Sequence, residues 1–222
     1  MAATTVRLVG LEVGDEVGPW RDAGFAVAGE DLVVGGVAIA LRGAQQPRGL
    51  RGWALQPPAV GDCDGLASTR AAAAAAGRSG DAPIHPNGTT ALDHVVVASD
   101  DIERTTRALA AVGITPRRSV VGARGDGDEE TVYRFFLLGT SVLELVGPTR
   151  PRGDGPARFV GLAFTTSALD DLGELAGTPR PAVQPGRRIA TLRTDALGIS
   201  VPTVLLSPRP PRPPREREVV GG

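Results

Sequence analysis

Few residue types in this chain can do chemistry, and two of them lie in strand-like segments. The 222 residues include two histidines and one cysteine, and every basic residue is arginine. Without lysine, a Schiff-base lysine and a phosphate-loop lysine are excluded. Cys63 has no histidine near it in the sequence, so no cysteine nucleophile is expected. His94 and Glu144 are the leading candidates, as an imidazole and a carboxylate that can transfer protons or bind a cation.

Both candidates lie in segments that are typical of strands. His94 belongs to the stretch LDHVVVA and Glu144 to the stretch SVLELVG. Because strand side chains alternate between faces, each candidate lies opposite its larger aliphatic neighbours. If those aliphatic side chains pack beneath a helix, His94 and Glu144 both point into the same concave space.

The stretch QPGRRIATLR supplies further candidates for ligand binding. An arginine inside a cavity would recognise a carboxylate or phosphate group. Alternation places Arg187 on the same face as Ile189, and we expect Ile189 to face the helix layer. We therefore predict that Arg188 faces the cavity, together with Gln184, which precedes the Pro-Gly turn.

Two more residues complete the candidate set. In the stretch TVYRFFLLG, Arg134 shares a face with Phe136, and Tyr133 shares the other face with Phe135. One of these pairs should line the cavity, and we take Arg134 as a ligand-binding candidate. His85, in the sequence HPNG just before a strand, could fold over the cavity mouth.

A repeated order of elements organises the chain. The clearest copy begins at Leu92 with a strand, continues with a helix that Gly113 ends, and closes with three strand-like segments. A second copy begins at Phe159, with its helix ended by Gly177, and a shorter copy begins at Thr5. The repeat predicts an α+β fold built from tandem βαβββ modules.

The copies divide the chain into a short module, a linker, a paired domain and a tail. The linker is rich in Pro, Ala and Gly and contains LASTRAAAAAAG, which predicts a surface helix capped by Asp64. The tail is Pro-rich and charged, so it is expected to be extended. The predicted bounds are 1–56 for the N-terminal module, 57–90 for the linker, 91–150 and 157–208 for the paired modules of the domain 91–208, and 209–222 for the tail.

A βαβββ unit in tandem, opened by LDHVVV and closed by LELVGP, resembles the vicinal-oxygen-chelate superfamily of glyoxalase, bleomycin-resistance and dioxygenase-like proteins. The resemblance covers residues 92–208 well and residues 5–56 more loosely. It implies curved mixed sheets around a cavity. It also implies one divalent metal ion (Zn, Fe, Mn or Ni) with His94 and Glu144 as ligands.

The resemblance leaves several functions open. The leading expectation is a metal-dependent lyase, isomerase or dioxygenase that acts on a small oxygenated metabolite, with Glu144 as ligand or base. However, the positions that match His94 and Glu144 in the next copy are Gly161 and Val204, which offer no donor. The alternative is a metal-free protein that binds or sequesters a drug or metabolite. A third is a structural member whose modules mediate assembly.

Composition limits the partners. The formal net charge is −1, so no basic field would attract nucleic acid or an anionic membrane. No apolar run reaches the roughly 18 residues that span a bilayer, and no signal-peptide core follows Met1. A single cysteine suits a reducing compartment, so we expect a cytoplasmic protein. The expected partner is a small molecule, and the unpaired first module gives some reason to expect a homodimer.

Overall fold

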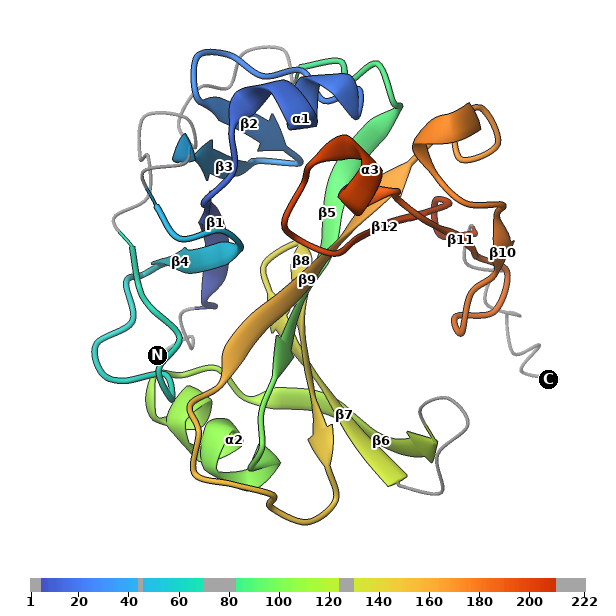
Figure 1. Cartoon of the computed structure of the whole chain (residues 1–222). Coiled ribbons are helices and arrows are strands. Elements are labelled where there is room, and N and C mark those ends of the chain that lie inside the picture. Colours follow the sequence, from blue (N-terminus) through green and yellow to red (C-terminus); the bar gives the residue numbers. More distant parts are fainter. Residues whose placement is uncertain (1–4, 44–45, 70–82, 124–129, 211–222) are drawn as a thin grey trace, which may run out of the picture.

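The computed structural model describes residues 5–43, 46–69, 83–123 and 130–210. Figure 1 shows strands as the main elements, with few helices. None of the described helices is long and apolar enough to cross a bilayer. The elements are β1 Arg7–Val13, α1 Val17–Asp22, β2 Asp31–Val34, β3 Val37–Leu41, β4 Leu50–Gln56, β5 Thr89–Ala98, α2 Ile102–Ala111, β6 Pro116–Ala123, β7 Glu130–Leu138, β8 Ser141–Pro148, β9 Arg158–Thr166, the 3-10 helix η2 Gly173–Leu175, β10 Arg180–Pro181, β11 Arg188–Thr191, α3 Thr194–Leu197 and β12 Thr203–Leu206.

The second and third copies of the repeat form one eight-stranded sheet of order β10-β11-β12-β9-β5-β8-β7-β6. In each half, the first strand of the module runs parallel to the last, β5 to β8 and β9 to β12. The two halves join through the antiparallel pair β5 and β9. The sheet curves, so that β6 and β7 form one arm and β10 and β11 the other (Figure 1). The predicted α+β fold of tandem βαβββ modules is confirmed for this pair.

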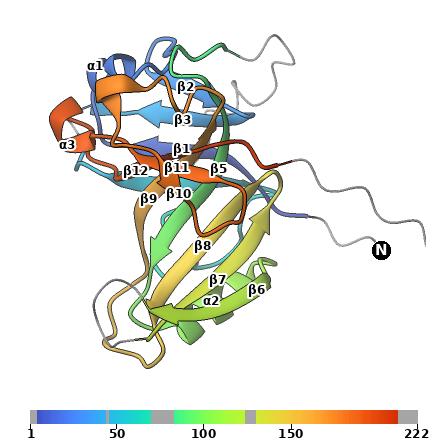
Figure 2. The same cartoon turned by 90° about the vertical axis from the view of Figure 1, so that its right-hand side faces the viewer.

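The N-terminal module forms a separate sheet of order β2-β3-β1-β4. Its elements follow the order βαβββ along the chain, but β1 runs parallel to β3 and antiparallel to β4, so the strand order in the sheet differs from that of the paired modules. This sheet packs on the face of β5 and β9 that lies away from the two arms (Figures 1 and 2). Ring centroids lie 5.2 Å apart for Phe25 and Phe164, and 5.5 Å apart for Trp53 and Phe159. Since the first module packs within its own chain, its packing gives no reason to expect a second copy.

The helix of the middle copy is formed as expected. Asp101 caps α2, because its carboxylate accepts a hydrogen bond from the Arg104 backbone N–H at 2.9 Å. Gly113, with a φ of 85°, follows the end of α2. The prediction of an α-helix between residues 167 and 177 was wrong, because this stretch contains turns, η2 and a β-bridge from Ala176 to Leu192. Gly173 has a φ of 54° there, which interrupts a right-handed helix.

The prediction that Asp64 caps a helix was wrong, because residues 65–69 are not helical. It has a φ of 58°, and its carboxylate accepts a hydrogen bond from Nε of Arg104 at 2.8 Å and another from the Thr105 hydroxyl. The linker is therefore fastened to the start of α2 by Asp64. Most of the predicted linker helix, residues 70–82, lies outside the described residues, as does the tail from residue 211.

Candidate functional site

The inner face of the large sheet holds a cavity of about 630 Å³ between the two arms. This volume is within the range of small-molecule sites, which is about 300–1,000 Å³. Its walls combine apolar and aromatic side chains with a few charged groups. The lining residues are Asp93, His94, Arg118, Val120, Gly122, Tyr133, Phe135, Val142, Glu144, Ala182, Val183, Gln184, Pro185, Ile189, Leu206 and Arg209.

His94 and Glu144 both line this cavity, where the alternation of their strands places them. β5 and β8 pair in parallel, with His94 opposite Val142 and Val96 opposite Glu144. Nε2 of His94 lies 3.7 Å from Oε2 of Glu144. The side chains are 16% and 21% exposed, so both are largely shielded but reachable from the cavity.

Asp93 is a site residue that the sequence analysis missed. Its carboxylate lies 2.9 Å from Nδ1 of His94 and 2.7 Å from Nη1 of Arg187. Strict alternation would place Asp93 opposite His94, but the register with β9 shifts between Leu92 and His94. The irregularity lets neighbouring side chains line the same cavity. An Asp-His dipeptide inside an expected strand was the only signal available.

The surroundings of Asp93 keep it ionised. Burial opposes ionisation, but hydrogen bonds from His94 and Arg187 and the Arg187 charge hold the pKa of Asp93 well below its usual value. An ionised carboxylate only accepts hydrogen bonds, so Nδ1 of His94 carries the proton. In this tautomer the lone pair of the ring is on Nε2, on the side of Glu144.

The prediction that Arg188 faces the cavity was wrong. Arg188 pairs with Asp170 at 2.7 Å on the exposed surface, whereas Arg187 is buried and contacts Asp93. Ile189, which was expected to face the helix layer, lines the cavity. β11 begins only at Arg188, so Arg187 lies in the preceding turn, where strand alternation does not set its direction.

Gln184 lines the cavity as predicted, and its Oε1 accepts a hydrogen bond from Nη1 of Arg187 at 2.7 Å. Gln184 thus joins the network around Asp93. The preference for Arg134 was wrong. Tyr133 and Phe135 line the cavity, while Arg134 reaches the opposite face and pairs with Glu103 on α2.

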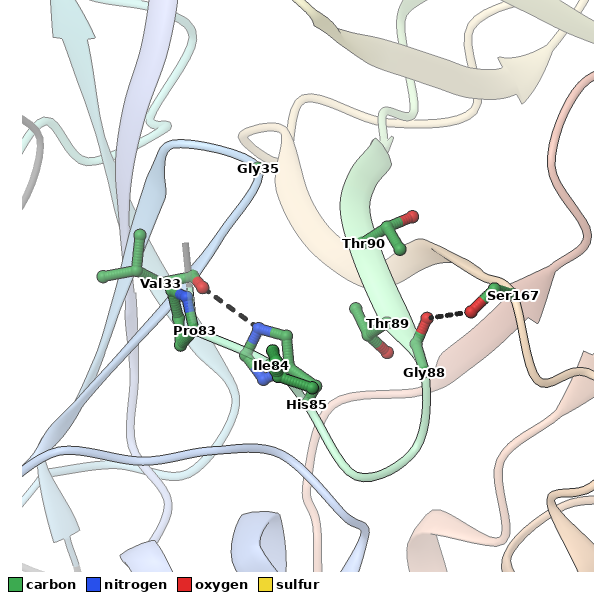
Figure 3. A pocket seen from close by; sticks show the side chains of 9 residues that line it. All are labelled: Val33, Gly35, Pro83, Ile84, His85, Gly88, Thr89, Thr90 and Ser167. Atoms are coloured by element: carbon green, nitrogen blue, oxygen red, sulfur yellow. Dashed lines mark hydrogen bonds between the residues drawn. The ribbon is translucent and has the colours of Figure 1, made fainter. Parts of the chain in front are cut away.

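His85 does not line the cavity, contrary to prediction, but lines a different pocket. It is buried between the N-terminal sheet and the start of β5, beside a small pocket of about 250 Å³ (Figure 3). Its Nδ1 accepts from the Ala26 backbone N–H at 3.0 Å, and its Nε2 lies 3.1 Å from the Val33 carbonyl. Both ring nitrogens are therefore used to join the N-terminal module to the rest of the chain.

No family model and no curated protein matches the chain. Among solved structures it is similar to the methylmalonyl-CoA epimerase of Mycobacterium tuberculosis, at 17% identity and a TM-score of 0.44, over 58% of this chain and 94% of that chain. A Streptomyces coelicolor methylmalonyl-CoA epimerase variant in complex with 2-nitronate-propionyl-CoA has 20% identity and a TM-score of 0.40, covering 55% and 99%. The hypothetical protein BH1468 from Bacillus halodurans C-125 has 14% identity and a TM-score of 0.41, covering 55% and 96%.

The strand order of the large sheet identifies the fold of the paired modules. Two four-stranded modules of the same order join through their first strands and curve around one cavity. The paired modules have the vicinal-oxygen-chelate fold. Within this fold, β5–β8 and β9–β12 are equivalent halves, and their registers define equivalent positions.

The second half of the vicinal-oxygen-chelate pair offers no donor to match the first. Val96 pairs with Glu144 in one half and Ala163 with Val204 in the other, so Val204 is the counterpart of Glu144. By the same offset, the counterpart of His94 is Gly161. Across the described residues, no group of three or more His, Cys, Asp or Glu side chains is placed to hold a metal ion. A catalytic metal usually takes three protein ligands, so the donor set does not fit a tight metal centre.

Proposed function

We propose that this protein binds a small oxygenated molecule directly with His94 and Glu144, as a metal-free member of its fold. The observation that carries the proposal is that two hydrogen-bond acceptors, Nε2 of His94 and Oε2 of Glu144, lie 3.7 Å apart at the cavity wall. Two acceptors recognise a ligand hydroxyl better than a ligand carbonyl or carboxylate. The pair therefore calls for a hydrogen-bond donor on the ligand, and the donor that we propose is a hydroxyl, which gives its proton to one of the two acceptors.

The same pair supports proton transfer as the chemistry of the site. Asp93 fixes the tautomer of His94, so Nε2 is free to accept a proton from the bound ligand. The imidazolium formed in this way would lie between the carboxylates of Asp93 and Glu144, which stabilise its charge. Glu144 is the second candidate base. An isomerisation that moves a proton beside a hydroxyl group would use both side chains.

A metal-dependent reaction is the second candidate. It is favoured by the arrangement of Asp93, whose carboxylate holds the distal nitrogen of His94 in the way that outer-shell partners hold metal-bound histidines. The spacing of 3.7 Å also lets His94 and Glu144 share one ion at ordinary ligand distances of about 2 Å. Weighed against this candidate are the donor-free positions Gly161 and Val204.

Metal content separates the two candidates. We expect protein purified without chelator to contain no stoichiometric zinc, iron, manganese or nickel when measured by mass spectrometry. The His94→Ala variant should give the same result. Near-stoichiometric metal that disappears in His94→Ala would replace the direct-binding proposal with the metal-dependent one.

Hydroxyl recognition can be tested with benzyl alcohol and benzyl methyl ether. In the ether, a methyl group replaces the hydroxyl proton, so the ether cannot donate a hydrogen bond. Binding is followed by the NMR methyl signals of Val142 and Leu206, which line the cavity. We expect the alcohol to bind about tenfold more tightly, because a hydrogen bond to a charged acceptor contributes about 1.5–3 kcal/mol.

Glu144→Gln and His94→Ala should each reduce this preference for the alcohol. Glu174→Gln is the matched control, since Glu174 is exposed on η2 and does not line the cavity. Equal binding of alcohol and ether to the unaltered protein would contradict the proposal.

A further inference from the structure

Besides Asp93, His94 and Glu144, the cavity is lined by charged side chains that the proposed function does not use. Arg118 lines the cavity from β6, the edge strand of the arm formed by β6 and β7. Its side chain is exposed, and no hydrogen bond or ion pair of its guanidinium is found within the described part of the chain. Arg209, the other cavity arginine with an exposed side chain, lies 3.7 Å from Asp93 and is thus partly engaged.

Arg118, Phe135 and Glu144 form one row across three neighbouring strands. Arg118 is directly opposite Phe135 in the pairing of β6 with β7, and Phe135 is directly opposite Glu144 in the pairing of β7 with β8. All three line the cavity. Neighbouring strands are about 4.8 Å apart, so the backbones of Arg118 and Glu144 are separated by about 10 Å.

The row places two charges of opposite sign at the ends of an aromatic surface. Glu144 has His94 beside it but no arginine within ion-pair distance among the described residues. The charge of Asp93, by contrast, is matched by Arg187. The end of the cavity at Glu144 therefore disfavours an anion, and the end at Arg118 favours one.

We infer that the ligand is an amphipathic hydroxy acid: its hydroxyl lies at His94 and Glu144, its apolar body lies along Phe135, and its carboxylate is bound by Arg118. This inference rests on the proposed function for the hydroxyl end and adds the recognition of an anionic group at the other end. A guanidinium can hold a carboxylate through two parallel hydrogen bonds, which makes Arg118 the residue that selects acids over neutral molecules.

The test uses 4-(hydroxymethyl)benzoate and 4-(hydroxymethyl)benzamide, which share their shape and hydroxyl but differ in charge. Both are titrated into the unaltered protein, Arg118→Gln and Arg117→Gln, and binding is followed by the methyl signals of Val142 and Leu206. Arg117 is the matched control, because it neighbours Arg118 on β6, is also exposed and does not line the cavity.

We expect the benzoate to bind the unaltered protein and Arg117→Gln about tenfold more tightly than the benzamide. In Arg118→Gln the two probes should bind within about twofold of one another. Equal binding of both probes to the unaltered protein, or a preference that survives in Arg118→Gln, would overturn the inference and leave hydroxyl binding intact. If neither probe moves the cavity signals at millimolar concentrations, the proposed function fails together with the inference.

Discussion

Nη1 of Arg187 lies 2.7 Å from Oδ1 of Asp93, and both side chains are almost completely buried, at 1% and 6% exposed. The pair lies behind His94 at the cavity wall, and the guanidinium also donates to Gln184, Thr165 and the Ser207 carbonyl. A buried ion pair of this kind is costly to break, since the remaining charge has no water to replace its partner. The position of His94 therefore depends on a pair that is also important for the stability of the fold.

Asp93→Asn should reduce the free energy of unfolding by about 3 kcal/mol, because it leaves the Arg187 charge buried without a partner. Urea unfolding followed by circular dichroism measures this change. The control is Arg188→Gln, which removes only an exposed ion pair with Asp170 and should change stability by less than about 1 kcal/mol. Similar losses in the two variants would show that the buried pair has no special role.

The stability of the protein should fall in acid because of Asp93. Its pKa is lower in the folded protein than in the unfolded chain, so its contribution is complete above the unfolded value of about 4. As the pH falls below that value, the unfolded chain takes up the proton first and stability declines. Urea midpoints measured from pH 5 to pH 3 should fall less steeply in Asp93→Asn than in the unaltered protein.

His85 should make the protein less stable at mildly acidic pH. Burial lowers the pKa of His85, although its hydrogen bond to the Val33 carbonyl opposes that shift. The folded protein therefore keeps the neutral ring as the pH falls below about 6.5, while the unfolded chain becomes protonated. Stability is complete above this pH and declines below it.

The His85 prediction is checked by comparing unfolding free energies at pH 7.5 and pH 5.5. His85→Gln removes the titrating group and should show a smaller decrease between the two pH values than the unaltered protein. A decrease of the same size in both proteins would assign the effect to other groups.

Phe25→Ala should destabilise the two sheets together. Phe25 is buried against Phe164 of β9, and a substitution of this kind typically costs about 3–5 kcal/mol. The two tryptophans of the chain, Trp20 and Trp53, both lie buried in the N-terminal module, so their fluorescence reports on that module. The methyl signal of Val142 reports on the large sheet.

We expect tryptophan fluorescence and the Val142 signal to give the same urea midpoint, and Phe25→Ala to lower both midpoints equally. The reason is that one continuous cluster of buried side chains includes residues of both sheets. A fluorescence transition that moves alone would indicate that the N-terminal module unfolds separately.

Asp64→Ala should release the linker from α2 and lower the free energy of unfolding, since Arg104 loses its carboxylate partner and the buried Thr105 hydroxyl loses one of its hydrogen bonds. Hydrogen exchange at the amides of Gly65 and Ala157 should become faster; the Ala157 N–H donates to the Asp64 carbonyl at 2.9 Å. Asp170→Ala, which removes an exposed carboxylate, should leave these amides unchanged. Unchanged protection in Asp64→Ala would contradict the role of the Asp64 side chain.

The sequence was sufficient for the paired modules because their strands alternate regularly and α2 has a cap and a terminal glycine. The same regularity placed His94 and Glu144 at one cavity. It failed where the backbone departs from a regular strand, at the irregularity beside Asp93 and in the turn that holds Arg187.

The sequence also could not decide between the two faces of β7, because Tyr133 with Phe135 and Arg134 with Phe136 are equally compatible with a partly buried strand. The order of the N-terminal sheet depends on the pairing of β1 with β3 and β4, which are distant from it in sequence, and no local pattern contains this information.

The two equivalent halves of the large sheet contribute unequally to the cavity. The half from β5 to β8 provides His94, Glu144 and Arg118, while the half from β9 to β12 provides mostly wall, including Ile189 and Leu206. Substitutions of wall residues such as Val183, Ile189 and Leu206 should therefore change the size of the accepted molecule, while Gln184 and Arg187 must be kept because they hold Asp93 behind His94. A duplicated unit in this arrangement lets one copy carry the reactive side chains while the other copy forms much of the wall that encloses them.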